Sequence, residues 1–154
     1  MYKKILVPLD GSPLAEGILP QVGEMARVHG ARIHLLRVGF ALVFPGADPA
    51  EAQLETIVEA EGYIEGIRKR LEAEGIPAEA SVRYGFPAEE ILTHARRNGV
   101  DLIAMATHGR TGPARWVLGS VAEQVLRKAE VPVLLFRPPR AAQGKETLAR
   151  YATA

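Results

Sequence analysis

The sequence predicts an α/β fold, with one five-stranded parallel sheet and helices on both of its faces. Short apolar runs that suit strands alternate along the chain with longer segments of helical periodicity. This alternation gives a parallel sheet, because each helix carries the chain back across one face through a right-handed crossover. The length of 154 residues suits one domain, and 47% apolar residues suffice for a sizeable core. We therefore expect one Rossmann-like domain over residues 1–138 and a flexible C-terminal tail over residues 139–154.

The first strand and the first helix are expected near the N-terminus. The apolar run KKILVPL predicts a strand over residues 3–9. Ser12 is then the expected N-cap and Pro13 the first helical residue, where its missing N–H costs nothing. The helix is expected to run to His29 with a kink at Pro20, because an internal proline removes a hydrogen bond and clashes with the preceding turn.

A buried strand, a long helix and an edge strand are expected next. Residues 32–38 are rich in apolar side chains, as in a strand buried on both faces. The apolar segment 39–49 is expected to fold over a site or to pack under the following helix. Residues 50–74 predict an amphipathic helix, in which spacings of three, four and seven relate the apolar residues Leu54, Ile57, Val58, Ile64, Ile67 and Leu71. Residues 78–84 alternate between polar and apolar side chains, which favours a strand at the edge of the sheet.

The second half of the chain contributes a helix and two strands at residues 87–98, 101–106 and 131–137. Between the two strands, another helix is expected to start at Ser120. Ser120 would act as its N-cap, and Glu123 would complete a capping box. Pro132 favours an edge position for the last strand, because proline cannot donate a hydrogen bond to a neighbouring strand.

The composition excludes several kinds of site. Nineteen basic and 18 acidic residues give a net charge of +1, so a broad basic surface for nucleic acid is not expected. The chain has no cysteine, which excludes disulfides, thiol catalysis and cysteine-ligated metals. The four histidines are not spaced like metal ligands on one helix face, so no metal site is expected.

Targeting and catalytic signatures are also missing from the sequence. The apolar run at the N-terminus ends at Asp10, too early for a secretory signal, and no apolar run approaches a membrane span. We expect a cytoplasmic protein without membrane contact. No serine lies in a nucleophile elbow, and no carboxylate pair has a recognisable catalytic spacing. No residue is therefore assigned a catalytic role.

The stretch from Asp101 to Ser120 combines a predicted strand, a glycine-containing loop and a helix start. Gly109 and Gly112 allow a turn or a close approach of a ligand to the backbone. The N-terminus of a helix attracts phosphate through free N–H groups and the helix dipole. A turn followed by an ordinary helix cap would account for the same sequence pattern without a ligand. The two standard phosphate signatures, Gly-x-x-x-x-Gly-Lys-Ser/Thr and Gly-x-Gly-x-x-Gly after the first strand, are absent.

The same stretch matches a known family motif of glycine, two residues, glycine, nine residues, glycine, and serine or threonine. Gly109, Gly119 and Ser120 occupy the matching positions, and Ala106 stands in the first glycine position. The segments ILVPLDGS near the start and VPVLL near the end are also typical of that family. Over roughly residues 1–138, the chain resembles the universal stress protein family in its ATP-binding form.

This resemblance implies an ATP site. It would place the ribose near Asp10, the adenine against the backbone of Val38, and the phosphates at Gly109, Gly119 and Ser120. Magnesium would be held mainly by the phosphates. The residues implied in binding are Pro8, Asp10, Val38, Ala106, His108, Gly109, Arg110, Gly119, Ser120 and Val121.

Several of these residues also have a simpler interpretation. Asp10 is a common turn residue, and Ser120 can serve only to cap a helix. His108 fits a phosphate neighbour or a polar turn residue, and Arg110 fits a phosphate donor or a solvent-exposed side chain.

Three hypotheses for function remain open. The first is an ATP-binding regulatory protein of the stress response, acting as a nucleotide-dependent switch or interaction module. The alternatives are a slow ATPase or autophosphorylating enzyme, and a dimeric interaction module that binds no nucleotide. The resemblance also implies a homodimer joined through strand 131–137.

Overall fold

The computed structural model describes residues 1–40, 45–108 and 118–137. Five strands form one sheet: β1 (Lys4–Leu9), β2 (Arg32–Gly39), β3 (Ala78–Tyr84), β4 (Leu102–Ala106) and β5 (Val133–Phe136). The helices are α1 (Pro13–Glu16), α2 (Leu19–His29), α3 (Pro49–Ala73), α4 (Pro87–Arg97) and α5 (Ser120–Lys128). All strand pairs are parallel, in the order β3-β2-β1-β4-β5. The predicted α/β fold is confirmed.

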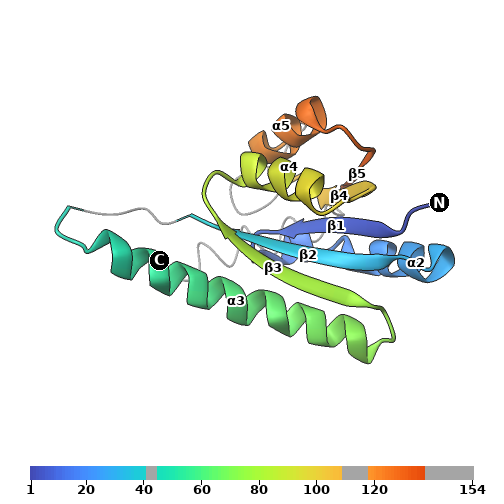
Figure 1. Cartoon of the computed structure of the whole chain (residues 1–154), viewed down its shortest axis with the longest axis horizontal. Coiled ribbons are helices and arrows are strands. Elements are labelled where there is room, and N and C mark those ends of the chain that lie inside the picture. The colour runs from blue at the N-terminus through green and yellow to red at the C-terminus, as the bar shows by residue number, and fades with distance from the viewer. Residues whose placement is uncertain (41–44, 109–117, 138–154) are drawn as a thin grey trace.

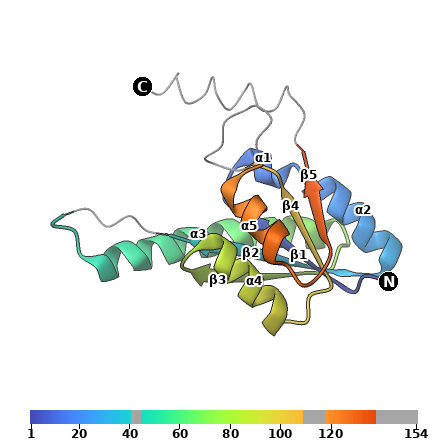
Figure 2. The ribbon, with the colours of Figure 1, turned by 90° about the horizontal axis from the view of Figure 1, so that it is seen from above.

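The helices cover both faces of the sheet (Figures 1 and 2). Helices α1, α2 and α3 lie on one face, and α4 and α5 lie on the other. The central strand β1 serves both layers, because successive side chains of a strand point to opposite faces. Ile5 and Val7 join the cluster with α2 and α3, whereas Leu6 joins the cluster with α4 and α5. All three side chains are fully buried.

The strand order creates a topological switch point at β1. From β1 the chain first adds β2 and β3 on one side and later adds β4 and β5 on the other. Open α/β sheets bind ligands outside the carboxyl ends of the strands where this reversal occurs. Strands β3 and β5 lie at the two edges, as the sequence predicts.

The first predicted helix is in fact two helices. Ser12 caps α1 as expected, with its Oγ accepting a hydrogen bond from the N–H of Ala15 at 3.2 Å. The chain then breaks at Gly17 and Ile18, and Pro20 lies in the first turn of α2. A proline is tolerated there because the first-turn N–H groups have no partner within the helix. The predicted single helix with a kink at Pro20 was therefore wrong.

The start of α5 also differs from the prediction. Gly119 is the N-cap, no side chain makes a capping hydrogen bond, and Ser120 is the first helical residue. The predicted capping box of Ser120 and Glu123 was wrong, because Glu123 instead donates its backbone N–H to the Gly119 carbonyl at 2.8 Å. Pro132 precedes β5 rather than lying within it. Among the described helices, none combines the length and apolar character needed to cross a membrane.

The long helix α3 buries only part of its apolar face. Ile64, Ile67 and Leu71 pack against the sheet. Leu54 and Val58, from the N-terminal half, are 61% and 59% exposed. Figure 1 shows the reason, since this half of α3 extends past the end of the sheet.

Candidate functional site

The carboxyl ends of β2, β1 and β4 lie side by side in the sheet. Val38 is near the end of β2, Asp10 follows β1, and Ala106 is the last residue of β4. Gly119 joins the start of α5 to the end of β4, because its N–H donates to the Thr107 carbonyl at 2.9 Å. The structure thus brings most of the predicted site residues to the carboxyl ends of these strands and the adjoining start of α5. They are Pro8, Asp10, Val38, Ala106, His108, Gly119, Ser120 and Val121. Gly109 and Arg110 lie outside the described residues.

The Asp10 carboxylate organises the turn after β1. Its Oδ1 accepts hydrogen bonds from the backbone N–H of Ser12 at 2.9 Å and from the Ser12 hydroxyl at 2.6 Å. This is the turn-forming use of aspartate, in which the side chain bonds to the backbone two residues on. It holds the end of β1 in a fixed shape beside β2 and β4.

The Val38 carbonyl faces the space beyond the end of β1. Along β2, the N–H of Arg32 donates to Lys3 next to β1, whereas the N–H of Ile33 donates to Pro77 next to β3. Because alternate residues of a strand direct their backbone groups to opposite neighbours, Val38 faces the β1 side. The β1–β2 register ends at the pair Leu9 and Arg37, so Val38 lies one residue past it.

The Arg37 guanidinium occupies this space. Its Nη1 donates to the Val38 carbonyl at 3.0 Å. Its Nη2 would lie 3.7 Å from a Cβ atom at Gly11. The sequence analysis did not include Arg37 among the site residues. A cationic residue near the end of a mostly apolar strand was the feature that could have identified it.

The backbone at Gly119 leaves no room for a side chain. A Cβ atom at this position would lie 2.8 Å from the Thr107 carbonyl oxygen. Thr107 is itself fixed from the other side, because its N–H donates to the Phe136 carbonyl of β5 at 2.8 Å. The fold therefore requires glycine at position 119 with or without a ligand.

His108 makes one local contact and leaves one nitrogen without a partner. Its Nδ1 lies 3.1 Å from the Thr107 hydroxyl oxygen. Its Nε2 is buried and has no hydrogen-bond partner among the described residues. The polar turn contact expected of His108 is present.

Comparison with known proteins fixes the family of this chain. The model of the universal stress protein family matches residues 1–137. The universal stress protein MJ0531 of Methanocaldococcus jannaschii is 35% identical over 145 residues, which cover 91% of this chain and 85% of that protein. The chain belongs to the universal stress protein family.

Solved structures of universal stress proteins agree with this fold. The structure of MJ0577 from Methanocaldococcus jannaschii is 35% identical, has a TM-score of 0.79, and is matched over 90% of this chain and 98% of its own. A universal stress protein of Archaeoglobus fulgidus, solved in complex with dAMP, has a TM-score of 0.67 at 24% identity. That match covers 87% of this chain and 97% of the other, and at this identity it supports the fold alone.

This universal stress protein carries a polar network between α1 and α3. The Tyr63 hydroxyl donates to Glu16 Oε1 at 3.0 Å, and Arg70 donates to Glu16 Oε2 at 2.9 Å. Burial, followed by the charge of Glu16, raises the pKa of the Tyr63 phenol, so it stays protonated as the donor. Asp10 raises and Arg37 lowers the same pKa, which indicates that the network lies close to the end of β1.

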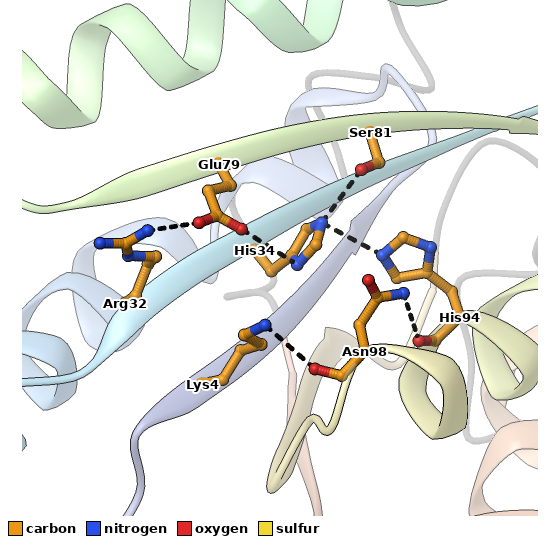
Figure 3. Close-up of polar contacts among 7 residues, drawn as sticks. All are labelled: Lys4, Arg32, His34, Glu79, Ser81, His94 and Asn98. Atoms are coloured by element: carbon orange, nitrogen blue, oxygen red, sulfur yellow. Dashed lines mark hydrogen bonds and ion pairs between the residues drawn. The ribbon is translucent and has the colours of Figure 1, made fainter.

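A buried histidine pair lies on the α4 side of the sheet (Figure 3). His34 Nε2 of β2 is 3.1 Å from His94 Nε2 of α4 and 3.0 Å from the Ser81 hydroxyl oxygen of β3. Glu79 Oε2 lies 3.7 Å from His34 Nδ1. The charge of this carboxylate favours a proton on His34 Nδ1, although that atom makes no hydrogen bond among the described residues, and with this tautomer His34 Nε2 can accept the Nε2–H of His94.

Burial lowers the pKa of both histidines in this pair, and lowers that of His94 to about 4. The pair is therefore neutral near pH 7. Sequence spacing does not reveal it, because its members come from different elements 60 residues apart. Within the described residues, no group of three or more His, Asp or Glu side chains could hold a metal ion.

Proposed function

We propose that this universal stress protein binds ATP across the carboxyl ends of β2, β1 and β4 and acts as a nucleotide-dependent regulatory protein of the stress response. The observation that carries the proposal is the order of these strands. It arranges Val38, Asp10 and Gly119 in a row, which supports placing the base, the ribose and the phosphates there in that order. Neighbouring strands lie about 4.8 Å apart, so the row spans roughly 10 Å.

The chemistry of each position supports this placement. The Val38 carbonyl faces past the end of β1 and can accept a hydrogen bond from a base. Asp10 offers carboxylate oxygens to ribose hydroxyls. The first turn of α5 offers backbone N–H groups at Ser120 and Val121 to phosphate, and the buried His108 Nε2 can donate to the same group. Pro8 and Ala106 would shape the floor, and Gly109 and Arg110 would complete the phosphate side.

The ligand class and assembly complete the proposal. The Archaeoglobus fulgidus complex with dAMP supports an adenine nucleotide as the ligand to test. Magnesium would be held mainly by the phosphates. We assign no catalytic side chain, so turnover would be slow. We also propose that the protein is cytoplasmic and forms a homodimer through β5.

The test separates phosphate binding from folding at Ser120, which is exposed and makes no side-chain hydrogen bond to another described residue. In Ser120→Asp, a carboxylate in the first turn of α5 suits the helix dipole but repels phosphate. We expect ATP affinity, measured by calorimetric titration, to fall about tenfold or more. Ser120→Asn introduces a side chain with the shape of aspartate but no charge, and it should retain wild-type affinity for ATP. Adenosine, which has no phosphate, should bind all three proteins equally.

Two results would contradict the proposal. A folded wild type that binds no ATP at millimolar concentration would leave the interaction module without a nucleotide as the function. Equal ATP affinity in Ser120→Asp and Ser120→Asn would exclude the proposed position of the phosphates at the start of α5.

A further inference from the structure

Arg37 places a cation where the proposed base would lie. The guanidinium reaches over the turn at Gly11 and donates to the Val38 carbonyl at 3.0 Å. Both contacts lie past the last residue pair of β1 and β2. The carbonyl proposed for the base is thus already an acceptor for a side chain of the same strand.

The hydrogen-bonding groups of the partners conflict for adenine. A guanidinium carries only donors, and the amino group of adenine is also a donor. The two groups compete for the carbonyl of Val38, and their donor hydrogens repel each other if both remain beside it. A purine with a carbonyl in place of that amino group offers an acceptor instead, to which a guanidinium can donate.

We propose that Arg37 sets the base preference of this site by competing with the adenine amino group for the Val38 carbonyl. This inference rests on the proposed nucleotide site. Adenine must displace the guanidinium from Val38, whereas hypoxanthine can accept a hydrogen bond from it. Arg37 therefore lowers the preference of the site for ATP over inosine triphosphate (ITP).

The pair ATP and ITP isolates this effect. Both carry the same ribose and triphosphate, so any attraction between Arg37 and phosphate cancels in the ratio of their affinities. In Arg37→Met, the long apolar side chain keeps packing volume but can no longer donate to Val38. Arg32→Met is the matched control, because it makes the same substitution at the opposite end of the same strand.

The experiment measures magnesium-ATP and magnesium-ITP binding to the three proteins by calorimetric titration. In the wild type we expect ATP and ITP to bind with similar affinity. In Arg37→Met the ratio should shift about tenfold toward ATP, the size expected from one hydrogen bond to a charged group. Arg32→Met should keep the wild-type ratio.

Each remaining outcome overturns a distinct statement. If ATP binds and Arg37→Met leaves the ATP to ITP ratio unchanged, Arg37 does not set base preference, although the nucleotide site stands. If neither nucleotide binds the folded wild type, the proposed function fails and this inference fails with it. Arg37→Leu, which also removes every donor, provides a second test if Arg37→Met does not fold. A wild-type ratio in Arg37→Leu would also overturn the inference.

Discussion

At the scale of single residues, the buried histidine pair makes stability depend on protonation. In the neutral state, the Nε2–H of His94 can donate to His34 Nε2, at 3.1 Å. An additional proton would have to go to His94 Nδ1, which is buried without a hydrogen-bond partner among the described residues. Lys4 and Arg83 oppose protonation further, and Glu79 favours it only at His34.

The sign of the pH dependence follows from these shifts. In the unfolded chain both histidines titrate near pH ~6.5. In the folded chain the pKa of His94 is about 4, and that of His34 is also lowered. Between these values the unfolded chain binds more protons, so acid lowers the free energy of unfolding.

We predict that the free energy of unfolding falls by about 1–3 kcal/mol as the pH is lowered from ~6.5 to ~4 because of this pair. His94→Gln should flatten this part of the profile, measured by urea denaturation at a series of pH values. His29→Gln, a partly exposed histidine outside the pair, is the control and should keep the wild-type slope. An unchanged slope in His94→Gln would show that other groups cause the acid sensitivity.

Single residues also show why a sequence motif has two meanings. The glycine at position 119 matches a phosphate-binding motif, yet a Cβ atom there would meet the Thr107 carbonyl at 2.8 Å. The close contact between the two backbones therefore requires glycine at this position even without a ligand. Arg37 shows the opposite case, since a functional candidate has no motif and is found only when its contact with Val38 is seen.

At the scale of elements, the sequence predicted whether a segment is a helix or a strand better than it predicted where that segment begins and ends. The amphipathic pattern of α3 is real, but periodicity cannot show how far the sheet extends beneath a helix. Ile64 is 2% exposed over the sheet, whereas Val58 is 59% exposed beyond it. Likewise, the sequence suggested one helix across Pro20, whereas α1 ends at Glu16 and α2 begins at Leu19, which places Pro20 in a first turn where a proline is tolerated.

We predict that two truncations on the same helix differ strongly in their cost. Ile64→Ala should lower the free energy of unfolding by about 2–4 kcal/mol, because it leaves a cavity in the core. Val58→Ala should change it by less than about 0.5 kcal/mol, because the side chain is mostly exposed. Urea denaturation of both variants measures the difference. A large loss in Val58→Ala would mean that another surface covers this half of α3.

At the scale of the whole molecule, the alternation of strands and helices predicted the parallel sheet, whereas the side-chain pattern of residues 78–84 and Pro132 predicted the two edge strands. The order β3-β2-β1-β4-β5 places the ends of β2, β1 and β4 together, although they are distant in the sequence. Composition and spacing do not give this order, and only the family resemblance pointed to one site from three strands. The His34 and His94 pair had no such guide and was missed.

The edge strand β5 gives the last prediction, for the homodimer. Its backbone pairs with β4 through Pro132 and Phe136, whose carbonyls accept from Ile103 and Thr107. The alternate residues Val133 and Leu135 therefore direct their N–H and C=O groups outward. An apolar edge of this kind favours pairing with a second copy across a two-fold axis.

The variant must block this edge without damaging the protomer. Phe136 is unsuitable, because its ring lies 3.1 Å from the position of a Cβ atom at Gly17 and packs against the core. Leu135→Pro removes one outward N–H, and Leu135→Ala removes the same side chain but keeps that N–H. We predict by sedimentation velocity that the wild type and Leu135→Ala are dimers at micromolar concentration, and that Leu135→Pro shifts to monomer. Equal dimerisation of Leu135→Pro and Leu135→Ala would exclude backbone pairing at β5, because Leu135→Pro lacks the outward N–H that Leu135→Ala keeps.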